Sequence, residues 1–415
     1  MPNLPSLAAS PATMAETARG ASRATHREQV YLDYHASTPC DPRVVEAMLP
    51  FFIETFANPS SSIHAQGRQA AEAVERARAQ VAQAIGAAAG EVIFTSGATE
   101  SNNLAIQGAV RYATPGRRRV LATTIEHKCV LESCKWLAKQ GYDFEMIPVG
   151  EDGLVDLGAL VDLVDERTAL VSVQAASNEI GTIQPIAEVA QVVHRAGALL
   201  HSDAAQALGR IPVDVGPLGV DLLSLSGHKC YGPKGVGALY VRGGARSAPL
   251  EPLVFGGGQE SGLRSGTLNV PGIVGLGRAC EIAREEMARE SARIGRLRDW
   301  FEKLVLEAVQ DLRRNGALSR RLSGNSSLRF KGVDADALIA NLPEIALSTG
   351  SACTTGAPEP SHVLTAIGLS REDASSTVRV GIGRFTMEAE LRYAADRIAQ
   401  VVERIKSLQE ERQVV

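Results

Sequence analysis

Two polar residues stand at the ends of consecutive apolar segments, and their types suggest one chemistry. Lys229 follows the apolar run 221–225, and Asp203 follows the run 198–202, one strand–helix step upstream. A lysine at the end of a buried strand is desolvated, which favours its neutral, nucleophilic form. Each residue alone has an ordinary alternative, because a lysine can extend to solvent and an aspartate can cap a helix. Together they indicate a site in which a carboxylate and an amine act on one ligand.

This pairing is typical of enzymes that use pyridoxal phosphate (PLP). In such enzymes a carboxylate pairs with the pyridinium nitrogen, and a lysine holds the cofactor aldehyde as a Schiff base. The loop 95–100 (TSGATE) follows another apolar run, and small residues there could hold a phosphate on backbone N–H groups. A plain helix N-cap explains the same loop equally well. Signatures for ATP or NAD are missing, because no GxxxxGK[ST] occurs and the glycines at 256–258 lack a third spaced glycine.

The segments around these residues alternate between strand and helix patterns. Apolar runs predict buried strands at 91–95, 120–123, 144–149, 169–173, 198–202, 222–224 and 238–241. Amphipathic segments predict helices at 66–85, 130–139, 156–164 and 186–196, a long linking helix at 273–312 and a last helix at 387–409. The alternation predicts an α/β fold with a mostly parallel central sheet covered by helices. Ligands bind such sheets at the carboxyl ends of strands, where Asp203 and Lys229 stand.

Composition narrows the class of protein without naming a function. The net charge of −4 provides neither a basic face for nucleic acid nor a polybasic membrane anchor, and no apolar run is long enough for a membrane span. Cysteines are scattered and show no zinc-type spacing, so we expect no metal site and a reducing, cytoplasmic setting. The six cysteines are Cys40, Cys129, Cys134, Cys230, Cys280 and Cys353.

Three regions of the chain are expected to differ in organisation. Residues 1–29 are rich in Ala, Ser, Thr and Pro and predict a disordered extension, with an organellar targeting peptide as the alternative. Residues 41–288 are expected to form a large cofactor-binding domain. Residues 30–40 and 289–415 are expected to form a smaller α/β domain.

Six short motifs that occur in order carry a resemblance to a known family. They are ESNNLA (100–105), EHK (126–128), NEIG (178–181), SGHK (226–229), RSGT (264–267) and GSACT (350–354). Together they make the chain similar to cysteine desulfurases of the IscS/NifS-like type, which are class-V aminotransferase relatives with the PLP-dependent fold type I. The resemblance extends from about Tyr31 to Phe385.

The resemblance implies a role for each matching residue. Lys229 would hold the cofactor, Asp203 would stabilise its ring nitrogen, and His127 would stack on the ring and transfer protons. Gln206 and Asn178 would bind the ring hydroxyl, with Asn178 also near the substrate. The full set of implied cofactor contacts is Ala98, Thr99, His127, Asn178, Asp203, Gln206, Ser226, His228, Lys229 and, from the partner subunit of a homodimer, Thr267.

Two further residues would act on the substrate, L-cysteine. Arg379 matches the arginine that grips the substrate carboxylate, although from residue type alone Arg384 is an equal candidate. Cys353 would attack the substrate sulfur, leaving alanine and a persulfide, with His127 as one candidate for deprotonating its thiol. Its neighbourhood is small, polar and rich in glycine, which predicts an exposed mobile loop. We expect the other five cysteines to be structural.

The resemblance leaves the pathway open. It implies sulfur-acceptor proteins, such as an iron–sulfur scaffold, and no direct contact with nucleic acid or membrane; tRNA thiolation, DNA phosphorothioation or another route are alternatives. His35 and Ser37 depart from the family pattern, which usually has small residues and Thr there. A selenocysteine lyase, another PLP-dependent lyase or aminotransferase, and a non-catalytic platform for partners remain competing hypotheses.

Overall fold

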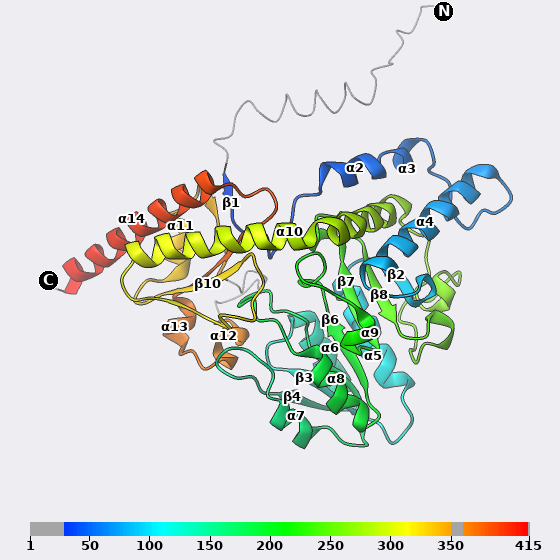
Figure 1. The fold of residues 1–415 in the computed structure, drawn as a ribbon. Coiled ribbons are helices and arrows are strands. Elements are labelled where there is room, and N and C mark those ends of the chain that lie inside the picture. Colours follow the sequence, from blue (N-terminus) through cyan, green and yellow to red (C-terminus); the bar gives the residue numbers. More distant parts are fainter. Residues whose placement is uncertain (1–28, 350–359, 414–415) are drawn as a thin grey trace, which may run out of the picture.

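A seven-stranded sheet forms the centre of the larger part of the molecule (Figure 1). The computed structural model describes residues 29–349 and 360–413. The strand order is β2 (Val92–Thr95), β8 (Gly237–Val241), β7 (Leu222–Ser226), β6 (Leu199–Asp203), β5 (Thr168–Ser172), β3 (Arg119–Thr123) and β4 (Asp143–Ile147). Only β8 runs against its neighbours among these strands, so the expected mostly parallel sheet is confirmed.

Helices cover both faces of this sheet, because successive strand residues point to opposite faces and both sets are apolar. On β3, Leu121 belongs to one buried cluster, whereas Val120 and Ala122 belong to another. The first cluster packs under α4 (Ala65–Ala84), α8 (Ile186–Arg195) and the start of α10 (Val270–Ala308). The second packs under α5 (Ala98–Tyr112) and α6 (Lys128–Lys139). Shorter helices are α2 (Pro42–Met48), α3 (Pro50–Ile53), α7 (Leu157–Leu163) and α9 (Val215–Leu218).

A second, smaller α/β part has its own sheet and core. Strands β12 (Thr377–Gly381), β10 (Asn325–Phe330) and β9 (Leu312–Arg314) form an antiparallel sheet, and β1 (Val30–Tyr31) pairs in parallel with β11 (Ile345–Ala346). Phe301 of α10 and Leu391 of α14 (Glu388–Gln413) are fully buried in its core. The remaining helices are α11 (Ala335–Ala340), α12 (His362–Ala366) and α13 (Arg371–Ser375). These separate cores support, as a proposal, the domain boundary expected near residue 288.

The helix α10 runs past both sheets and joins the two parts (Figure 1). It ends earlier than the pattern 273–312 predicted, because Val309 is already extended, with φ of −119°, and the chain then turns at Asp311, whose φ of +59° is left-handed. Leu312 therefore begins a strand. Near its start, α10 crosses α4 closely: a Cβ on Gly277 would lie 2.7 Å from Ala77 Cα and 2.8 Å from Ala77 Cβ. Glycine at this position permits the crossing.

We predict that Gly277→Ala lowers the free energy of unfolding by about 1–3 kcal/mol, because the added methyl group forces α4 and α10 apart. Gly295→Ala, on the same helix, is the matched control. Its Cβ would meet nothing closer than Ser323 Cβ at 3.8 Å, so helix propensity predicts a gain of up to about 1 kcal/mol. Denaturant unfolding measures both, and equal effects of the two variants would contradict this account of the crossing.

Candidate active site

A cavity of about 510 Å³ lies at the carboxyl edge of the large sheet. The residues that line it come from the ends of β2, β5, β6 and β7, from the start of α6 after β3, from the turn before β8 and from the segment around Ser37. The sequence-predicted cofactor contacts among them are Ala98, Thr99, His127, Asn178, Asp203, Gln206, Ser226, His228 and Lys229. Thr267 is exposed and lies outside this wall. A larger cavity of about 810 Å³ beside α4 contains none of these residues, so the chemistry converges in the smaller one.

Lys229 ends a short 3-10 turn directly after β7. Its Nζ donates to the backbone carbonyls of His35, at 2.6 Å, and Ala36, at 2.9 Å. The pKa of Lys229 is lowered to about 8, first by burial and then by the guanidinium groups of Arg210 and Arg379, against opposing contributions from Asp203 and Asp33. The amine is therefore neutral at a far lower pH than an ordinary lysine.

Asp203 ends β6 with both carboxylate oxygens engaged. Oδ1 accepts from the Ala205 N–H at 2.9 Å, and Oδ2 accepts from Asn102 Nδ2 at 2.7 Å. Asn102 lies on α5 and is fully buried; sequence reasoning gave it no role. A signal was present, because an asparagine on the apolar face of an amphipathic helix needs a buried partner. With both bonds in place, Asp203 still has lone pairs for a cationic N–H in the cavity.

His127 is the N-cap residue of α6. Its Nδ1 accepts from the Cys129 N–H at 3.2 Å and lies 3.0 Å from Cys129 Sγ. Burial lowers the pKa of His127 below its usual value. Cys129 on α6 also lines the cavity, whereas a purely structural place was expected for it.

The start of α5 is suited to an anion. Its N-cap residue Gly97 has no side chain to occupy the first backbone N–H groups, and its φ of +149° favours glycine. Nearby, Ser226 Oγ is buried and has no hydrogen-bond partner among the described residues, and the His228 ring contacts Ser37 Oγ at 3.3 Å. Free N–H groups at a helix start and an unpaired buried hydroxyl fit a phosphate group. Lys234, which sequence reasoning missed, adds a basic side chain to the same wall.

Gln206 is held by residues that sequence reasoning did not connect with it. Its Oε1 accepts from the Arg210 guanidinium and lies 3.0 Å from His35 Nδ1, and its Nε2 donates to the His35 carbonyl at 2.9 Å. Arg210 is partly buried and forms no ion pair with an acidic group of the described residues, donating instead to the Tyr34 carbonyl at 2.8 Å. Burial keeps the pKa of His35 well below its usual value. His35 thus orients the Gln206 amide, and its backbone carbonyl also accepts the hydrogen bond from Lys229 Nζ.

The structure separates the two candidate arginines. Arg384 is engaged by Asp41 and by Glu290 at 2.6 Å, and its guanidinium lies over the Tyr231 ring at 4.2 Å. Arg379 on β12 is outside the cavity wall but adjoins it, since its Nη1 donates to the Asn178 carbonyl at 3.2 Å. Its Nη2 pairs with Asp33 at 2.7 Å, and its buried Nε has no hydrogen-bond partner among the described residues. This arrangement favours Arg379 over Arg384 as the carboxylate-binding residue.

Cys353 lies outside the described residues. The residues on either side of that gap adjoin the site. Before it, the Ser348 carbonyl accepts from the Arg379 N–H at 2.7 Å. After it, Ser361 Oγ donates to Glu179 at 2.5 Å, and His362 Nε2 is 2.9 Å from the Glu126 carbonyl, next to His127. Both ends of the segment are therefore anchored beside Asn178 and His127. Of the remaining cysteines, Cys134, Cys230 and Cys280 are buried and Cys40 is partly buried.

No group of His, Cys, Asp and Glu side chains able to hold a metal ion occurs among residues 29–349 and 360–413. Within the same residues, no helix is long and apolar enough to cross a bilayer.

Comparison with known proteins agrees with this geometry. The family model described as aminotransferase class-V matches residues 30–393. A curated relative named cysteine desulfurase IscS, from Rickettsia rickettsii (strain Iowa), is 45% identical over 379 residues, which cover 91% of this chain and 92% of the relative.

Two solved structures are similar in fold. One, named NifS-like protein, has a TM-score of 0.84 and 38% identity, covering 90% of this chain and 99% of its own. Another, titled SspA in complex with cysteine, has a TM-score of 0.76 and 39% identity, covering 86% of this chain and 100% of its own. The chain therefore belongs to the aminotransferase class-V family, in its group of cysteine desulfurases.

We predict that Lys229 reacts with a small acylating reagent such as acetic anhydride with a rate that levels off above about pH 8. Only the neutral amine reacts, and with a pKa of about 8 roughly a tenth of it is neutral at pH 7. Peptide mass spectrometry of the cofactor-free protein measures the rate, with exposed Lys139 as internal reference. A rate that keeps rising to the ordinary lysine range near about pH 10.4 would contradict the depressed pKa.

Proposed function

We propose that this protein is a PLP-dependent cysteine desulfurase that converts L-cysteine to L-alanine and carries the sulfur as a persulfide on Cys353. The observation that carries the proposal is the convergence of Lys229, Asp203 and His127 on one cavity at the carboxyl edge of the sheet. The relatives named cysteine desulfurase support the reaction, and a solved relative titled as a complex with cysteine supports the substrate.

The described residues fit the cofactor at each of its polar groups. Lys229 would hold its aldehyde, Asp203 its ring nitrogen, and Gln206 and Asn178 its ring hydroxyl. The start of α5, with Ser226 and His228, would hold its phosphate, where Ser226 Oγ is buried and unpaired. Once bound, PLP supplies an electron sink that stabilises negative charge developing at the substrate Cα.

The residues around the bound cofactor then share the steps of the reaction. Arg379 binds the substrate carboxylate through its guanidinium fork, in place of the ion pair that it makes with Asp33. Lys229, whose pKa is lowered to about 8, removes the Cα proton in its neutral form and returns protons to carbon. The Cys353 thiolate attacks the substrate sulfur, the sulfur–Cβ bond breaks with its electron pair on the carbon side, and protonation at Cβ gives alanine. The transferred sulfur stays on Cys353 as the persulfide.

The persulfide must then pass to another molecule. We propose acceptor proteins such as an iron–sulfur scaffold, because the relatives carry the name IscS. Sulfur transfer for tRNA thiolation or DNA phosphorothioation uses the same first step. The partner protein, and not this site, therefore determines which acceptor receives the sulfur. A reducing compartment, in line with cytoplasmic placement, would keep Cys353 available for each turnover.

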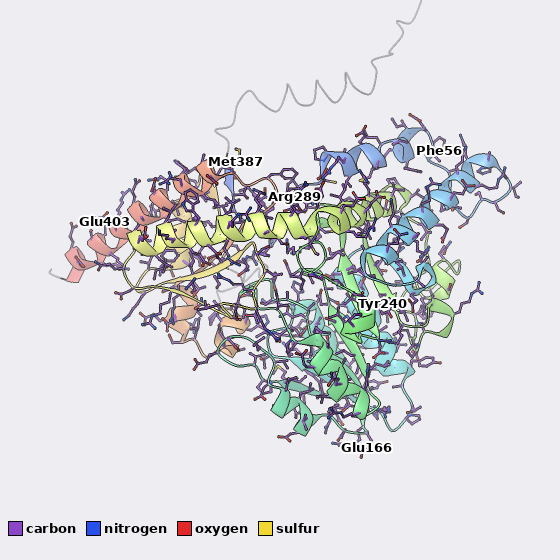
Figure 2. All side chains as sticks on the ribbon, viewed as in Figure 1. Phe56, Glu166, Tyr240, Arg289, Met387 and Glu403 are labelled. Carbon is purple, nitrogen blue, oxygen red and sulfur yellow. The ribbon has the colours of Figure 1, made fainter. Side chains whose placement is uncertain are left out.

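We also propose that the chain works as a homodimer. Four large apolar side chains between residues 52 and 63 are exposed, namely Phe52, Ile53, Phe56 and Ile63. Phe56, labelled in Figure 2, lies at the outer side of the molecule past α3. Exposed apolar side chains grouped in this way are typical of an interface. Thr267, which is exposed and outside its own cavity wall, would then contribute to the phosphate site of the second subunit.

We predict that incubating the PLP-loaded protein with L-cysteine adds one sulfur atom to the peptide that contains Cys353. Cys353→Ala should abolish this adduct and sulfide release, because it removes the proposed carrier of the persulfide. Cys40→Ala, which removes a partly buried cysteine outside the cavity wall, is the control and should leave both unchanged. Sulfur on a different cysteine would refute Cys353 as the nucleophile, and alanine formation at the wild-type rate by Cys353→Ala would contradict the persulfide route.

We predict that the double variant Phe56→Glu and Ile63→Glu is monomeric at micromolar concentration, because two carboxylates would be buried in the proposed interface. Met146→Glu is the matched control, since Met146 is an exposed apolar residue on β4, away from this group. Sedimentation velocity distinguishes the species. A monomeric wild-type protein, or a double variant that remains dimeric, would contradict this interface.

A further inference from the structure

Cys129 connects two residues of the proposed site. Its Sγ lies 3.0 Å from His127 Nδ1 and accepts a hydrogen bond from Asn102 Nδ2 at 3.1 Å. The same Asn102 Nδ2 donates to Asp203 Oδ2 at 2.7 Å. A continuous path of polar contacts therefore runs from His127 through Cys129 and Asn102 to Asp203.

The donor in the contact between Cys129 and His127 can be assigned from these neighbours. The sulfur already accepts from the Asn102 N–H and from the Thr99 side chain, so its own proton is free to point at His127 Nδ1. Burial raises the pKa of the Cys129 thiol to about 12, which keeps that proton in place. The Cys129 backbone N–H, which caps α6, donates to the same ring nitrogen at 3.2 Å. His127 Nδ1 thus faces two donors from one residue.

Two donors at Nδ1 determine where the ring proton of neutral His127 lies. A neutral imidazole has one N–H and one acceptor nitrogen, so Nδ1 must be the acceptor and Nε2 must carry the hydrogen. The alternative tautomer would place an N–H against the Cys129 N–H and lose at least one hydrogen bond, which favours the Nε2–H form by about tenfold. Among the described residues Nε2 has no hydrogen-bond partner, so its N–H is available to a ligand of the cavity.

We propose that Cys129 is a positioning residue that fixes His127 as the Nε2–H tautomer. Neutral His127 then acts as a hydrogen-bond donor toward the bound ligand and has no lone pair with which to take a proton from it. Proton removal at substrate carbon falls to Lys229, and deprotonation of Cys353 does not fall to neutral His127. The tautomer itself is independent of the ligand; only the consequence for catalysis rests on the proposed desulfurase function.

Other charged groups around His127 affect its charge without selecting its tautomer. Burial is the main cause that lowers the pKa of His127, and none of these groups hydrogen-bonds to its Nδ1 among the described residues. They are Lys128 on α6, Asp203 at the end of β6, Lys229 after β7 and His362 on α12.

The test is histidine ¹⁵N NMR on the full chain without cofactor, with the His127 signals assigned from a His127→Gln variant. Long-range ¹H–¹⁵N spectra report which ring nitrogen is protonated, and a pH titration gives the pKa of His127. The matched pair is Cys129→Ala and Cys129→Ser. The two substituents have nearly equal volume, but serine keeps a donor at the position of the thiol and alanine does not.

We expect the Nε2–H tautomer in the wild-type protein and in Cys129→Ser. In Cys129→Ala, loss of one donor to neutral His127 should raise its pKa by about half a unit relative to Cys129→Ser and increase the Nδ1–H fraction. A predominantly Nδ1–H wild-type protein, or equal pKa values in the two variants, would overturn the positioning role. Because the measurement needs no turnover, a failed desulfurase assay would not change its outcome.

Discussion

A single buried amine constrains the rest of the structure. Lys229 is held against two backbone carbonyls with the guanidinium groups of Arg210 and Arg379 nearby, and burial lowers its pKa to about 8. Relative to an ordinary lysine this corresponds to about 3 kcal/mol of lost stability at neutral pH. Because the unfolded chain binds more protons between pH 8 and about 10.4, stability from this group rises with pH across that window. This cost accompanies an amine that is neutral at a lower pH than an ordinary lysine, which is the form that the proposed reaction needs.

Segments from both parts of the molecule supply the groups around this amine. The residues before α2 contribute the carbonyls of His35 and Ala36, and Asp33 in the same segment pairs with Arg379 of the smaller sheet. Arg384 ties that part to Asp41 and to Glu290 of α10. The cavity therefore lies where the N-terminal segment, the large sheet and the smaller sheet meet. A displacement of the smaller part would change the Arg379 contacts before it changed the Asp203 contacts.

Much of this could be predicted from the sequence, because the strands are short apolar runs and the site residues stand at their ends. Every predicted strand is present within about two residues, and Asp203 and Lys229 occupy the predicted edge. The reversed direction of β8 has no such signal, since periodicity records burial and not direction. Asn102 and Arg210 were missed for a related reason. Tertiary packing brings Asp203 to Asn102, and a turn of the chain brings Gln206 to Arg210. The polar character of these residues does not by itself predict either contact.

The resemblance supplied roles that elementary chemistry left open, and the geometry sharpened some of them. It favoured Arg379 over Arg384, because the guanidinium of Arg384 is fully engaged. It moved Cys129 from a structural position to the cavity wall. It also showed that His35, a departure from the family pattern, orients Gln206. A residue that differs from the usual family motif can therefore support the same site through different contacts.

The most direct measurement of the central claim is a high-resolution crystal structure of the PLP-loaded protein. The account predicts a covalent bond from Lys229 Nζ to the cofactor, so that the amine leaves the His35 and Ala36 carbonyls. It also predicts Asp203 Oδ2 within hydrogen-bond distance of the ring nitrogen while it still accepts from Asn102. A cofactor attached to another lysine, or a ring nitrogen without contact to Asp203, would contradict it.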